Sequence, residues 1–217
     1  MKFNIPDYPG LQFGSIYCIG RNYAKHIEEM KSEMTEDPVV FLKPRSSIIF
    51  NGETILIPKA SNNVHHEVEL VLLIGSEITM VEPEDALKSV KALAVGLDIT
   101  ARDLQSSAKK NGLPWSLSKG FNTFAPVGNF VDYSPEIDLG QLDIMVNVNG
   151  EIRQSGNTSQ MLFSCEDIIS YLSKQFTLYP GDLIFTGTPQ GVSPIIPGDT
   201  VNASLHNNLS LLTVYVR

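Results

Sequence analysis

The segment from His66 to Ile74 constrains this chain most, because it places two acids inside an otherwise apolar run. Glu67 and Glu69 are separated by one residue, and in a strand such residues point to the same face. Two like charges at this spacing, flanked by side chains that favour burial, raise each other's pKa or require a cation between them. The pattern therefore predicts a strand that carries two carboxylates into a cation site. The alternative is a half-exposed strand whose acids face solvent.

A third acid lies in a second apolar run, Leu93 to Thr100, which can pair beside the first. Asp98 follows Glu69 by 29 residues (98 − 69), enough for a return connection between neighbouring strands. Magnesium, manganese and calcium ions prefer oxygen ligands, and three carboxylates would complete one face of an octahedral site with positions left open for substrate. We therefore expect Glu67, Glu69 and Asp98 to bind one divalent metal ion.

The whole chain has the size and composition of one globular unit. With 217 residues, 42% of them apolar, it can bury a full core, and neither a repeat nor a linker-like change in composition marks a boundary. We expect a single catalytic domain over residues 1–217, with residues 1–14 as an N-terminal lead-in. No apolar run reaches the length of about 18 residues that a membrane span needs, so no membrane partner is expected.

The net charge and the cysteine content indicate which classes of partner and which cellular compartment to expect. The net charge is −8, and no basic cluster exceeds Lys109-Lys110, which argues against a nucleic-acid partner. An anionic substrate must then be held by local cations. Cys18 and Cys165 are too few for a disulfide framework and lack CxxC spacing, so core thiols are expected. Because the start of the chain also lacks the pattern of a signal peptide, we expect a cytoplasmic protein.

The remaining pattern predicts short elements, most of them strands. A polar segment from about Tyr23 to Met34 reads as helical, and we interpret residues 22–36 as a mobile lid. Asn149-Gly150 predicts a hairpin turn, and Ser164 with Asp167 predicts a variant of the capping box at a helix start. The expected strands are 15–19, 39–43, 142–148, 151–154, 183–186, 201–205 and 209–216, and the other expected helices are 82–91 and 101–110. The sum is a β-rich α+β domain.

Six short motifs occur in a fixed order along the chain. They are Gly20-Arg21-Asn22-Tyr23, Phe41-Leu42-Lys43-Pro44, His66-Glu67-Val68-Glu69-Leu70, Asp98-Ile99-Thr100-Ala101-Arg102-Asp103, Lys119-Gly120-Phe121 and Thr186-Gly187-Thr188-Pro189. Together they resemble the fumarylacetoacetate hydrolase family, and most closely its single-domain branch of acylpyruvate hydrolases and oxaloacetate decarboxylases. The match runs from about Ser15 to the C-terminus, and six ordered motifs are specific where any one alone would be weak.

The resemblance implies a mixed β-sandwich roll with a few short helices, usually assembled as a homodimer. It also implies that a Mg²⁺ or Mn²⁺ ion is held by the acids that match Glu67, Glu69 and Asp98, the three residues selected independently above. Members of the family cleave a carbon–carbon bond next to a carbonyl in short β-diketo acids, or decarboxylate or tautomerise related 2-oxo acids.

These reactions share one intermediate. An acylpyruvate can chelate a divalent ion through its carboxylate and 2-oxo oxygen, and hydrolysis at the distant carbonyl then releases pyruvate as a metal-bound enolate. Decarboxylation of oxaloacetate needs the same enolate. Our leading interpretation is a Mg²⁺-dependent acylpyruvate hydrolase that also decarboxylates oxaloacetate. The alternatives are an isomerase, decarboxylase or tautomerase of unsaturated 2-oxo diacids in aromatic-acid catabolism, and a non-catalytic protein that binds metal and organic anions.

Hydrolysis also needs a base, and His26 with Glu29 meet on one face of the predicted lid helix at a spacing of i and i+3. His26 would take a proton from water, and Glu29 would orient the imidazole and stabilise its charged form. The resemblance assigns this pair the same role. The alternative is a solvent-facing helix with incidental charges, because several further acids and lysines crowd the segment.

Lys119 and Gln105 are the remaining catalytic candidates. Lys119 lies in an apolar context, where an ammonium group could stabilise an oxyanion. Gln105 follows Arg102 by one helical turn, so its amide could donate to the attacked carbonyl. Each residue has an ordinary alternative as a solvated side chain.

The substrate-binding candidates are Arg21, Lys43, Arg102 and Thr188. Arg21 could clamp a substrate carboxylate with its planar fork and Lys43 could add charge beneath it, although both could instead be structural ion-pair partners. Arg102 belongs to one of the six motifs and is assigned to the same set. Thr188 lies in a glycine-flanked turn, where its hydroxyl or backbone amide could reach the substrate carboxylate, or where the loop serves only to reverse the chain.

Overall fold

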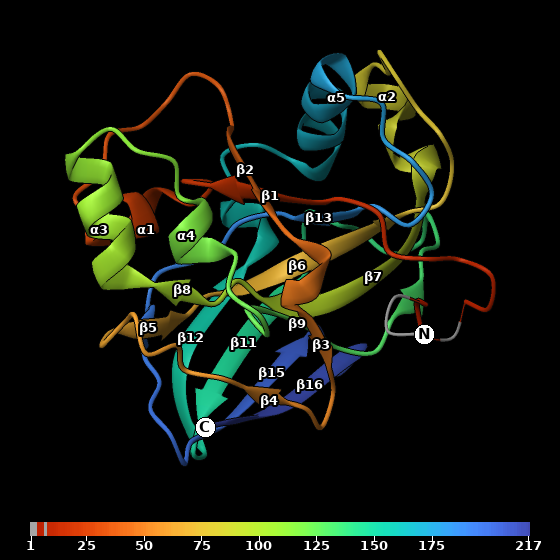
Figure 1. Ribbon diagram of the computed structural model, residues 1–217. Helices are drawn as coiled ribbons and strands as arrows, with labels where there is room; N and C mark the ends of the chain where they lie inside the picture. The colour runs from red at the N-terminus through yellow and green to blue at the C-terminus, as the bar shows by residue number, and fades with distance from the viewer. Residues whose placement is uncertain (1–3, 7) are drawn as a thin grey trace.

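The structure is a computed structural model that describes residues 4–6 and 8–217 (Figure 1). Part of the expected lead-in, residues 1–3 and 7, lies outside these residues. Over the described ranges the strands form three sheets. The helices α1, α3 and α4 gather at one end of the molecule, and α2 lies beside α5 at another (Figure 1). None of the helices in the described part of the chain is both long enough and apolar enough to cross a membrane.

The largest sheet has eight strands, in the order β2-β1-β13-β6-β7-β9-β3 with β10 paired beside β7, counted over the described residues. They are β1 (Ile16–Gly20), β2 (Val39–Lys43), β3 (Ile48–Phe50), β6 (Val68–Ile74), β7 (Val90–Leu97), β9 (Ala125–Val127), β10 (Val131–Asp132) and β13 (Leu183–Phe185). The sheet is mixed, because β1 runs parallel to β13 and β3 runs parallel to β9, whereas β6 is antiparallel to both of its neighbours.

Two smaller sheets complete the fold. The order β12-β11-β15-β16-β4 contains β4 (Thr54–Ile55), β11 (Asp143–Val148), β12 (Glu151–Asn157), β15 (Thr200–Leu205) and β16 (Ser210–Val216). The order β14-β5-β8 contains β5 (Val64–His66), β8 (Thr100–Ala101) and β14 (Ser193–Pro194). The helices are α1 (Ala24–Glu29), α2 (Pro83–Ala86), α3 (Arg102–Lys110), α4 (Ser116–Lys119) and α5 (Cys165–Gln175), with 3₁₀ turns at Arg45–Ser47, Leu87–Ser89 and Thr158–Gln160.

Strand β6 explains why the core has two halves. Its residues are buried throughout, and alternate side chains enter different hydrophobic clusters. Leu70 and Leu72 face the cluster shared with the five-stranded sheet, whereas Val71 and Leu73 face the cluster on the other side of the large sheet. A strand covered on both faces reads as a continuous apolar run. Each fully buried side chain of this kind contributes about 1.5–3 kcal/mol to the free energy of unfolding.

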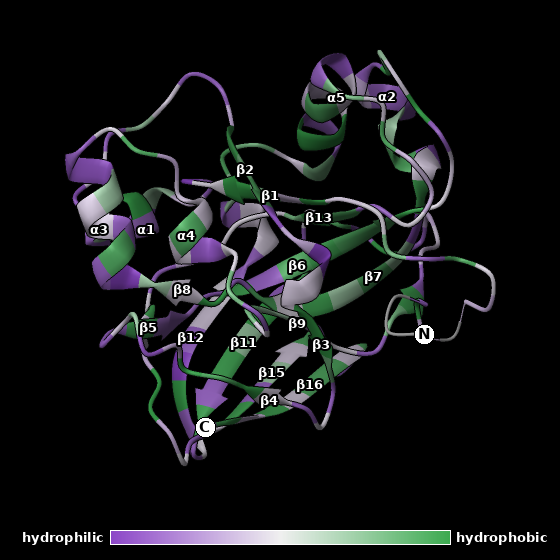
Figure 2. Ribbon diagram, viewed as in Figure 1, coloured by the Kyte–Doolittle hydropathy of each residue, from purple (hydrophilic) through white to green (hydrophobic). Residues whose placement is uncertain are grey.

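The hydropathy of the residues along the ribbon agrees with this arrangement. In Figure 2 the hydrophobic colour concentrates on the central strands, and hydrophilic colour marks α3 and many of the connections. Glu69 is the exception in β6, because alternation places its acid on the same side as Val71 and Leu73. A buried acid at the end of an apolar strand face is the kind of position that a binding site occupies.

Much of the predicted architecture is confirmed. The α+β, β-rich class is correct, and so is the Asn149-Gly150 hairpin, whose residues have φ of +54° and +87°. The capping box at the start of α5 forms as expected, with Ser164 Oγ accepting from the Asp167 N–H and the Asp167 carboxylate accepting from the Ser164 N–H. The paired runs around Glu69 and Asp98 form the antiparallel pair β6 and β7.

Three predicted boundaries are wrong. The strand expected from His66 to Ile74 is interrupted at Glu67, because β5 pairs in the small sheet and β6 in the large one. The lid helix covers Ala24–Glu29 and not Tyr23 to Met34, and Lys31 adopts a φ of +48° that is incompatible with a continuing helix. The helix expected over 82–91 ends at Ser89, because Val90 begins β7. Strands β3, β4, β9, β10 and β14 and helix α4 were not expected.

Candidate active site

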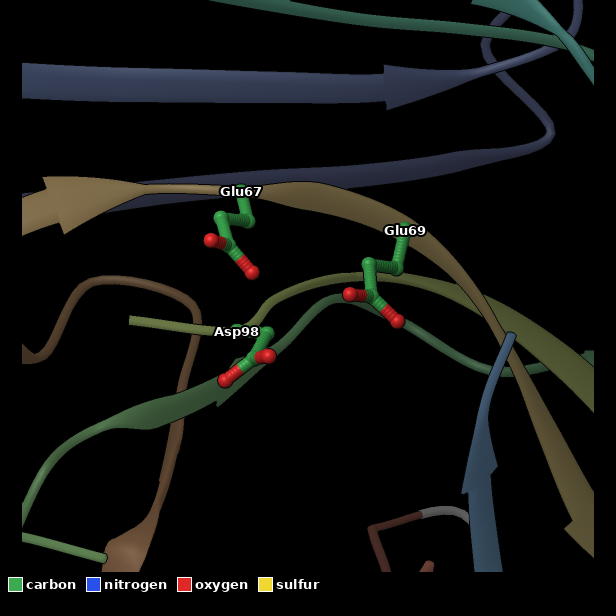
Figure 3. A group of neighbouring side chains, drawn as sticks. All are labelled: Glu67, Glu69 and Asp98. Carbon is green, nitrogen blue, oxygen red and sulfur yellow. The ribbon is translucent and has the colours of Figure 1, made fainter. Parts of the chain in front are cut away.

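The three predicted acids meet at one end of the β6–β7 pair. Glu67 lies just before β6 and Asp98 just after β7, and the Asp98 N–H donates to the Glu67 carbonyl at 2.8 Å. Glu69 pairs across the strands with Gly96. One carboxylate oxygen from each acid lies within 4.8 Å of the others, and all three residues are buried. Figure 3 shows the three carboxyl groups directed toward a common space.

Cations surround this cluster. Lys119 Nζ lies 2.8 Å from Glu67 Oε2 and also pairs with Asp98 Oδ2, so one ammonium group bridges two of the acids. Arg102 pairs with Glu67 Oε1 from the start of α3. Lys119 is the last residue of α4, which explains how this lysine is delivered into the buried site and why only 2% of its surface is exposed.

Lys43 lies beneath the cluster and supplies charge without a hydrogen bond. Its three ammonium protons are used by the carbonyl oxygens of Ile99, Lys119 and Phe124, at 3.0, 2.5 and 2.9 Å. Its nitrogen still lies 2.7 Å from Asp98 Oδ1. That carboxylate oxygen therefore has a nearby positive charge but no donor, and among the described residues it is a buried acceptor without a hydrogen bond.

The pKa values of Glu69 and Glu67 are shifted in opposite directions by burial and by neighbouring charges. Burial raises the pKa of Glu69 well above its ordinary value, and the neighbouring Asp98 and Glu67 carboxylates raise it further. Burial would also raise the pKa of Glu67, but Lys119 and Arg102 outweigh it and hold that pKa well below the ordinary range. Among the described residues Glu69 forms no ion pair, and the charge of Lys119 and the Gly187 N–H, which donates to Oε2 at 2.7 Å, lower its pKa only in part.

These observations fit a divalent cation. The donor set is all oxygen, as Mg²⁺ and Mn²⁺ prefer, and Asp98 Oδ1 accepts no hydrogen bond from the described residues. The buried Glu69 carboxylate lies beside two other acids and has no ion-pair partner among the described residues. Glu67, Glu69 and Asp98 would hold the ion.

A small pocket, partly open to solvent, lies over the acids. Of the predicted residues, it is lined by Arg21, His26, Glu67, Glu69, Asp98, Arg102, Gln105, Lys119 and Thr188. Lys43 and Glu29 do not line it. Lys43 lies beneath the acids, and Glu29 lies behind His26.

His26 and Glu29 form the expected pair. His26 Nδ1 lies 3.2 Å from Glu29 Oε2, and the Gly191 N–H donates to the other carboxylate oxygen at 3.1 Å. His26 is 9% exposed, so the alternative of an incidental solvent-facing histidine does not describe its position. Because Nδ1 faces Glu29, the second ring nitrogen is the one available to the pocket.

Gln105 and Thr188 are held by their neighbours. Arg102 Nη1 donates to Gln105 Oε1 at 2.7 Å, which leaves the Gln105 amide protons available to a ligand. The Thr188 hydroxyl donates to the Val68 carbonyl and accepts from Gln154 Nε2, both at 2.8 Å. The backbone amide is then the group that Thr188 can offer to the pocket.

The pocket also contains residues that were not selected from the sequence. Phe41 and Trp115 pack at a tilt of 57° with ring centroids 5.6 Å apart, and Lys109 Nζ lies 5.1 Å from the Trp115 ring centroid. Lys109 was noted only as half of a basic dipeptide, and its helical spacing from Arg102 and Gln105 on α3 was the available signal. Across residues 4–6 and 8–217, neither Lys109 nor Arg21 forms an ion pair. Both are therefore cations of the pocket that lack an anionic partner.

Comparison with known proteins agrees with this geometry. Residues 15–216 match the fumarylacetoacetate (FAA) hydrolase C-terminal family. The chain belongs to this family. It is 45% identical to human mitochondrial oxaloacetate tautomerase FAHD1 over 197 residues, which cover 91% of this chain and 89% of that protein. It is 48% identical over 188 residues to the uncharacterized protein PH0643 of Pyrococcus horikoshii, covering 87% of this chain and 82% of the relative.

Two solved structures of the family share the fold. The fumarylpyruvate hydrolase of Pseudomonas aeruginosa, in complex with Mn²⁺ and pyruvate, has a TM-score of 0.91 at 35% identity and covers 98% of this chain and 94% of its own. The 2-hydroxyhepta-2,4-diene-1,7-dioate isomerase of Mycobacterium marinum has a TM-score of 0.83 at 34% identity and covers 95% and 75%. Family members thus include hydrolases, isomerases and tautomerases that act on small oxo acids.

Proposed function

We propose that this protein is a Mg²⁺- or Mn²⁺-dependent hydrolase that cleaves short acylpyruvates to pyruvate and a carboxylate, acting as one catalytic domain. The observation that carries the proposal is that His26, paired with Glu29, lines the same pocket as Glu67, Glu69 and Asp98. A base and an acidic metal centre in one pocket are what hydrolysis of a 2-oxo acid requires.

The charges of the site suit such a substrate. Three carboxylates are matched by Lys119, Lys43 and Arg102, so the cluster is close to neutral by itself. A bound divalent ion would act as a Lewis acid toward the oxygen atoms of a 2-oxo acid and would add two positive charges. A pyruvate enolate carries two negative charges, one on its carboxylate and one on its enolate oxygen. The product formed during cleavage therefore restores neutrality in a buried site.

Each residue around the substrate has a role that its contacts support. His26 takes a proton from the attacking water, and Glu29 fixes its ring. Gln105, whose carbonyl oxygen is occupied by Arg102, directs its amide protons to the attacked carbonyl. Arg21 and the Thr188 backbone amide, which both line the pocket, hold a substrate carboxylate. Lys119 supplies positive charge beside the oxygen that becomes negative.

A second candidate is the tautomerisation or decarboxylation of oxaloacetate. The 45% identity to oxaloacetate tautomerase FAHD1 favours it. The free cations Arg21 and Lys109 would suit a second carboxylate, and His26 could move a proton between carbon and oxygen of a keto–enol pair. Neither reaction needs an attacking water molecule.

One set of assays separates these candidates. Purified protein is incubated with acetylpyruvate, fumarylpyruvate and oxaloacetate, each with Mg²⁺, with Mn²⁺ and with a chelator, while pyruvate release and the loss of enol absorbance are followed. Hydrolysis predicts metal-dependent pyruvate release from acetylpyruvate or fumarylpyruvate. Turnover of oxaloacetate alone would replace the hydrolase assignment with the second candidate. If no substrate reacts faster than with metal alone, both are wrong, and a non-catalytic metal and anion binder becomes the better description.

The proposed enzyme is a homodimer. An apolar groove beside the edge strand β2 supports this, because Leu42 and Leu113 are 49% and 58% exposed there and Phe176 is 41% exposed. An unpaired strand edge can pair with another chain, and exposed apolar patches mark protein–protein interaction sites among others. Light scattering after gel filtration checks the mass, and a mass near 23.9 kDa would contradict the dimer.

A further inference from the structure

In strand β12 an apolar side chain faces solvent and a polar side chain two residues later is buried. Ile152 is 63% exposed on this strand, whereas Gln154 is only 1% exposed. The register between β11 and β12 shifts at this point, so that Val146 pairs with Gln154 but Asn147 pairs with Ile152. Arg153 is the extra residue of a β-bulge, and bulges re-aim the side chains that follow them. The bulge turns a polar amide inward where alternation would expose it.

The buried amide uses its full hydrogen-bonding capacity. Gln154 Oε1 accepts from the Val68 N–H at 3.0 Å and faces His66 Nδ1 at 2.8 Å. Gln154 Nε2 donates to Thr188 Oγ1 and to the Pro189 carbonyl, both at 2.8 Å. A glutamine amide has two donors and an acceptor oxygen with two lone pairs, so none is left over. The strand partner of Gln154 lies in another sheet from β6, so these bonds connect distant parts of the fold.

Three of the hydrogen bonds close a ring around Val68. The Val68 N–H donates to Gln154, Gln154 donates to Thr188 Oγ1, and the Thr188 hydroxyl donates back to the Val68 carbonyl at 2.8 Å. Val68 stands between Glu67 and Glu69, so the ring fixes the peptide groups on both sides of this residue. The spacing and direction of the two glutamate side chains follow from these peptide groups.

Strand pairing alone does not provide this restraint. Strand β13 pairs with β6 as far as Phe185, which lies opposite Val71. The Thr186 N–H still donates to the Leu70 carbonyl, and beyond this bond the chain that follows β13 leaves β6. Without another partner, the buried N–H and carbonyl groups of Val68 on this side would make no hydrogen bond. Gln154 and Thr188 replace the missing strand at this point.

The same side chain also positions the loop that follows β13. Gly187 of this loop donates to Glu69, and Gly191 donates to Glu29. The loop packs against the β12 backbone so closely that a Cβ on Gly191 would lie 2.3 Å from the Arg153 carbonyl oxygen. Gln154 holds Thr188 and Pro189, which lie between the two glycines.

We propose that Gln154 is a positioning residue that fixes Glu67 and Glu69 relative to the 187–191 loop and thereby sets the affinity of the metal site. The inference rests on the proposed metal centre. Residues that orient metal ligands through hydrogen bonds typically change metal affinity by about 10–100-fold when they are replaced.

The test measures the affinity for Mn²⁺ by calorimetric titration of metal-free protein. Two variants remove different parts of the network. Gln154→Glu keeps the acceptor oxygen but loses both donors, and Gln154→Met keeps the length but loses every hydrogen bond. Both should raise the Kd for Mn²⁺ by about 10–100-fold. The control is Ser170→Ala, which removes a buried hydrogen bond to the Val81 carbonyl far from the site and should leave the Kd within about twofold.

A second variant protects the test against a folding defect. Thr188→Val keeps the side-chain volume and cuts the same ring at Oγ1, so it should weaken Mn²⁺ binding to a similar degree. Because the two residues act in one ring, the Gln154→Met and Thr188→Val effects should not add in the double variant.

An unchanged Mn²⁺ affinity in a variant with a native circular dichroism spectrum and a cooperative melt would overturn the role of Gln154. The failure of the wild-type protein to bind Mn²⁺ is a different result, because it would overturn the proposed metal centre itself.

Discussion

Glu29 and Gly191 lie 162 residues apart in sequence and are joined by a hydrogen bond of 3.1 Å from the Gly191 N–H to Glu29 Oε1. The other oxygen of the same carboxylate lies 3.2 Å from His26 Nδ1. Burial alone would raise the pKa of Glu29, but the contacts with His26 and Gly191 outweigh it and lower that pKa. An ionised carboxylate anchored at both oxygens therefore fixes the orientation of the candidate base.

Replacing His26 with alanine should slow hydrolysis by about 10²–10⁴-fold, the usual contribution of a general base. Mn²⁺ affinity should be retained, because His26 is not among the acids that hold the ion. The measurement is kcat with an acylpyruvate substrate, alongside a metal titration. Lys25→Ala changes an exposed residue of the same helix and serves as the control. Equal rates for His26→Ala and Lys25→Ala would remove His26 from the mechanism.

Gly191 and Gly198 allow the loop anchor to be tested with a matched pair. Both have φ of +100°, so alanine strains the backbone at each position by about 1–2 kcal/mol. Only at Gly191 would the new Cβ meet a backbone atom, the Arg153 carbonyl oxygen at 2.3 Å, because nothing lies within 4 Å at Gly198. Gly191→Ala should lower kcat/KM by at least about tenfold through the lost anchor of Glu29, as orienting carboxylates do in catalytic triads.

Gly198→Ala should change only the melting temperature. If Gly198→Ala reduces kcat/KM as much as Gly191→Ala does, the activity loss comes from general strain and not from the contact with Glu29.

The lowered pKa of Lys109 leads us to expect that kcat/KM falls at alkaline pH. Burial, together with the nearby positive charges of Arg102 and Arg21, lowers the pKa of Lys109 to about 8. The ammonium group is charged below this pH and becomes neutral above it, so kcat/KM for an anionic substrate should fall as the pH rises through about 8. Lys109→Met should lower kcat/KM at pH 7 and remove that limb of the profile.

The neighbouring residue supplies the control for this profile. Lys110 is exposed on the same turn of α3, and Lys110→Met should keep the wild-type pH dependence. A limb near pH 8 that survives in Lys109→Met would assign it to another group.

The raised pKa of Glu69 leads us to expect that the metal-free protein becomes more stable as the pH falls. Burial and the two neighbouring acids raise the folded-state pKa of Glu69 above its unfolded value, so the folded protein binds this proton more tightly. The free energy of unfolding should therefore rise as the pH falls from the folded pKa toward about 4.3, the ordinary value for glutamate. Glu69→Gln should abolish this pH dependence and should be at least as stable as wild type at pH 7.5 when a chelator is present.

Glu67→Gln is the matched opposite, because Lys119 and Arg102 lower the pKa of Glu67 and need its charge. We expect this variant to lose about 1–3 kcal/mol. Thermal denaturation between pH 5 and 8 measures both variants. A loss of stability in Glu69→Gln as large as that in Glu67→Gln would contradict the unequal charge environment of the two acids.

The cluster of three acids could be predicted from the sequence, because the pattern that indicates it lies within two short apolar runs. Acids at Glu67 and Glu69 inside an apolar run have few structural explanations, and β6 and β7 are long enough for alternation and pairing to be recognised. The partners of these acids were harder to find. Lys119 lies on a helix of four residues, and only its position in a family motif distinguished it from a solvated lysine.

The rest of the fold depends on contacts between distant segments. The expected strand is interrupted at Glu67 because residues 64–66 pair with Ser193–Pro194 and Thr100–Ala101 in a separate sheet. No local sequence pattern indicates this pairing. Gln154 was missed for a related reason. Its inward direction comes from a bulge between Ile152 and Gln154, which places the two on opposite faces although residues two apart in a regular strand share one face.

Calorimetric titration of Mn²⁺ into metal-free wild-type protein and into Glu69→Gln tests the central claim most directly. We predict one ion bound per wild-type chain and an affinity at least about tenfold lower in Glu69→Gln, because one of three carboxylate ligands is replaced by a neutral amide. No binding to the wild-type protein, or equal binding to both proteins, would contradict a metal centre formed by Glu67, Glu69 and Asp98.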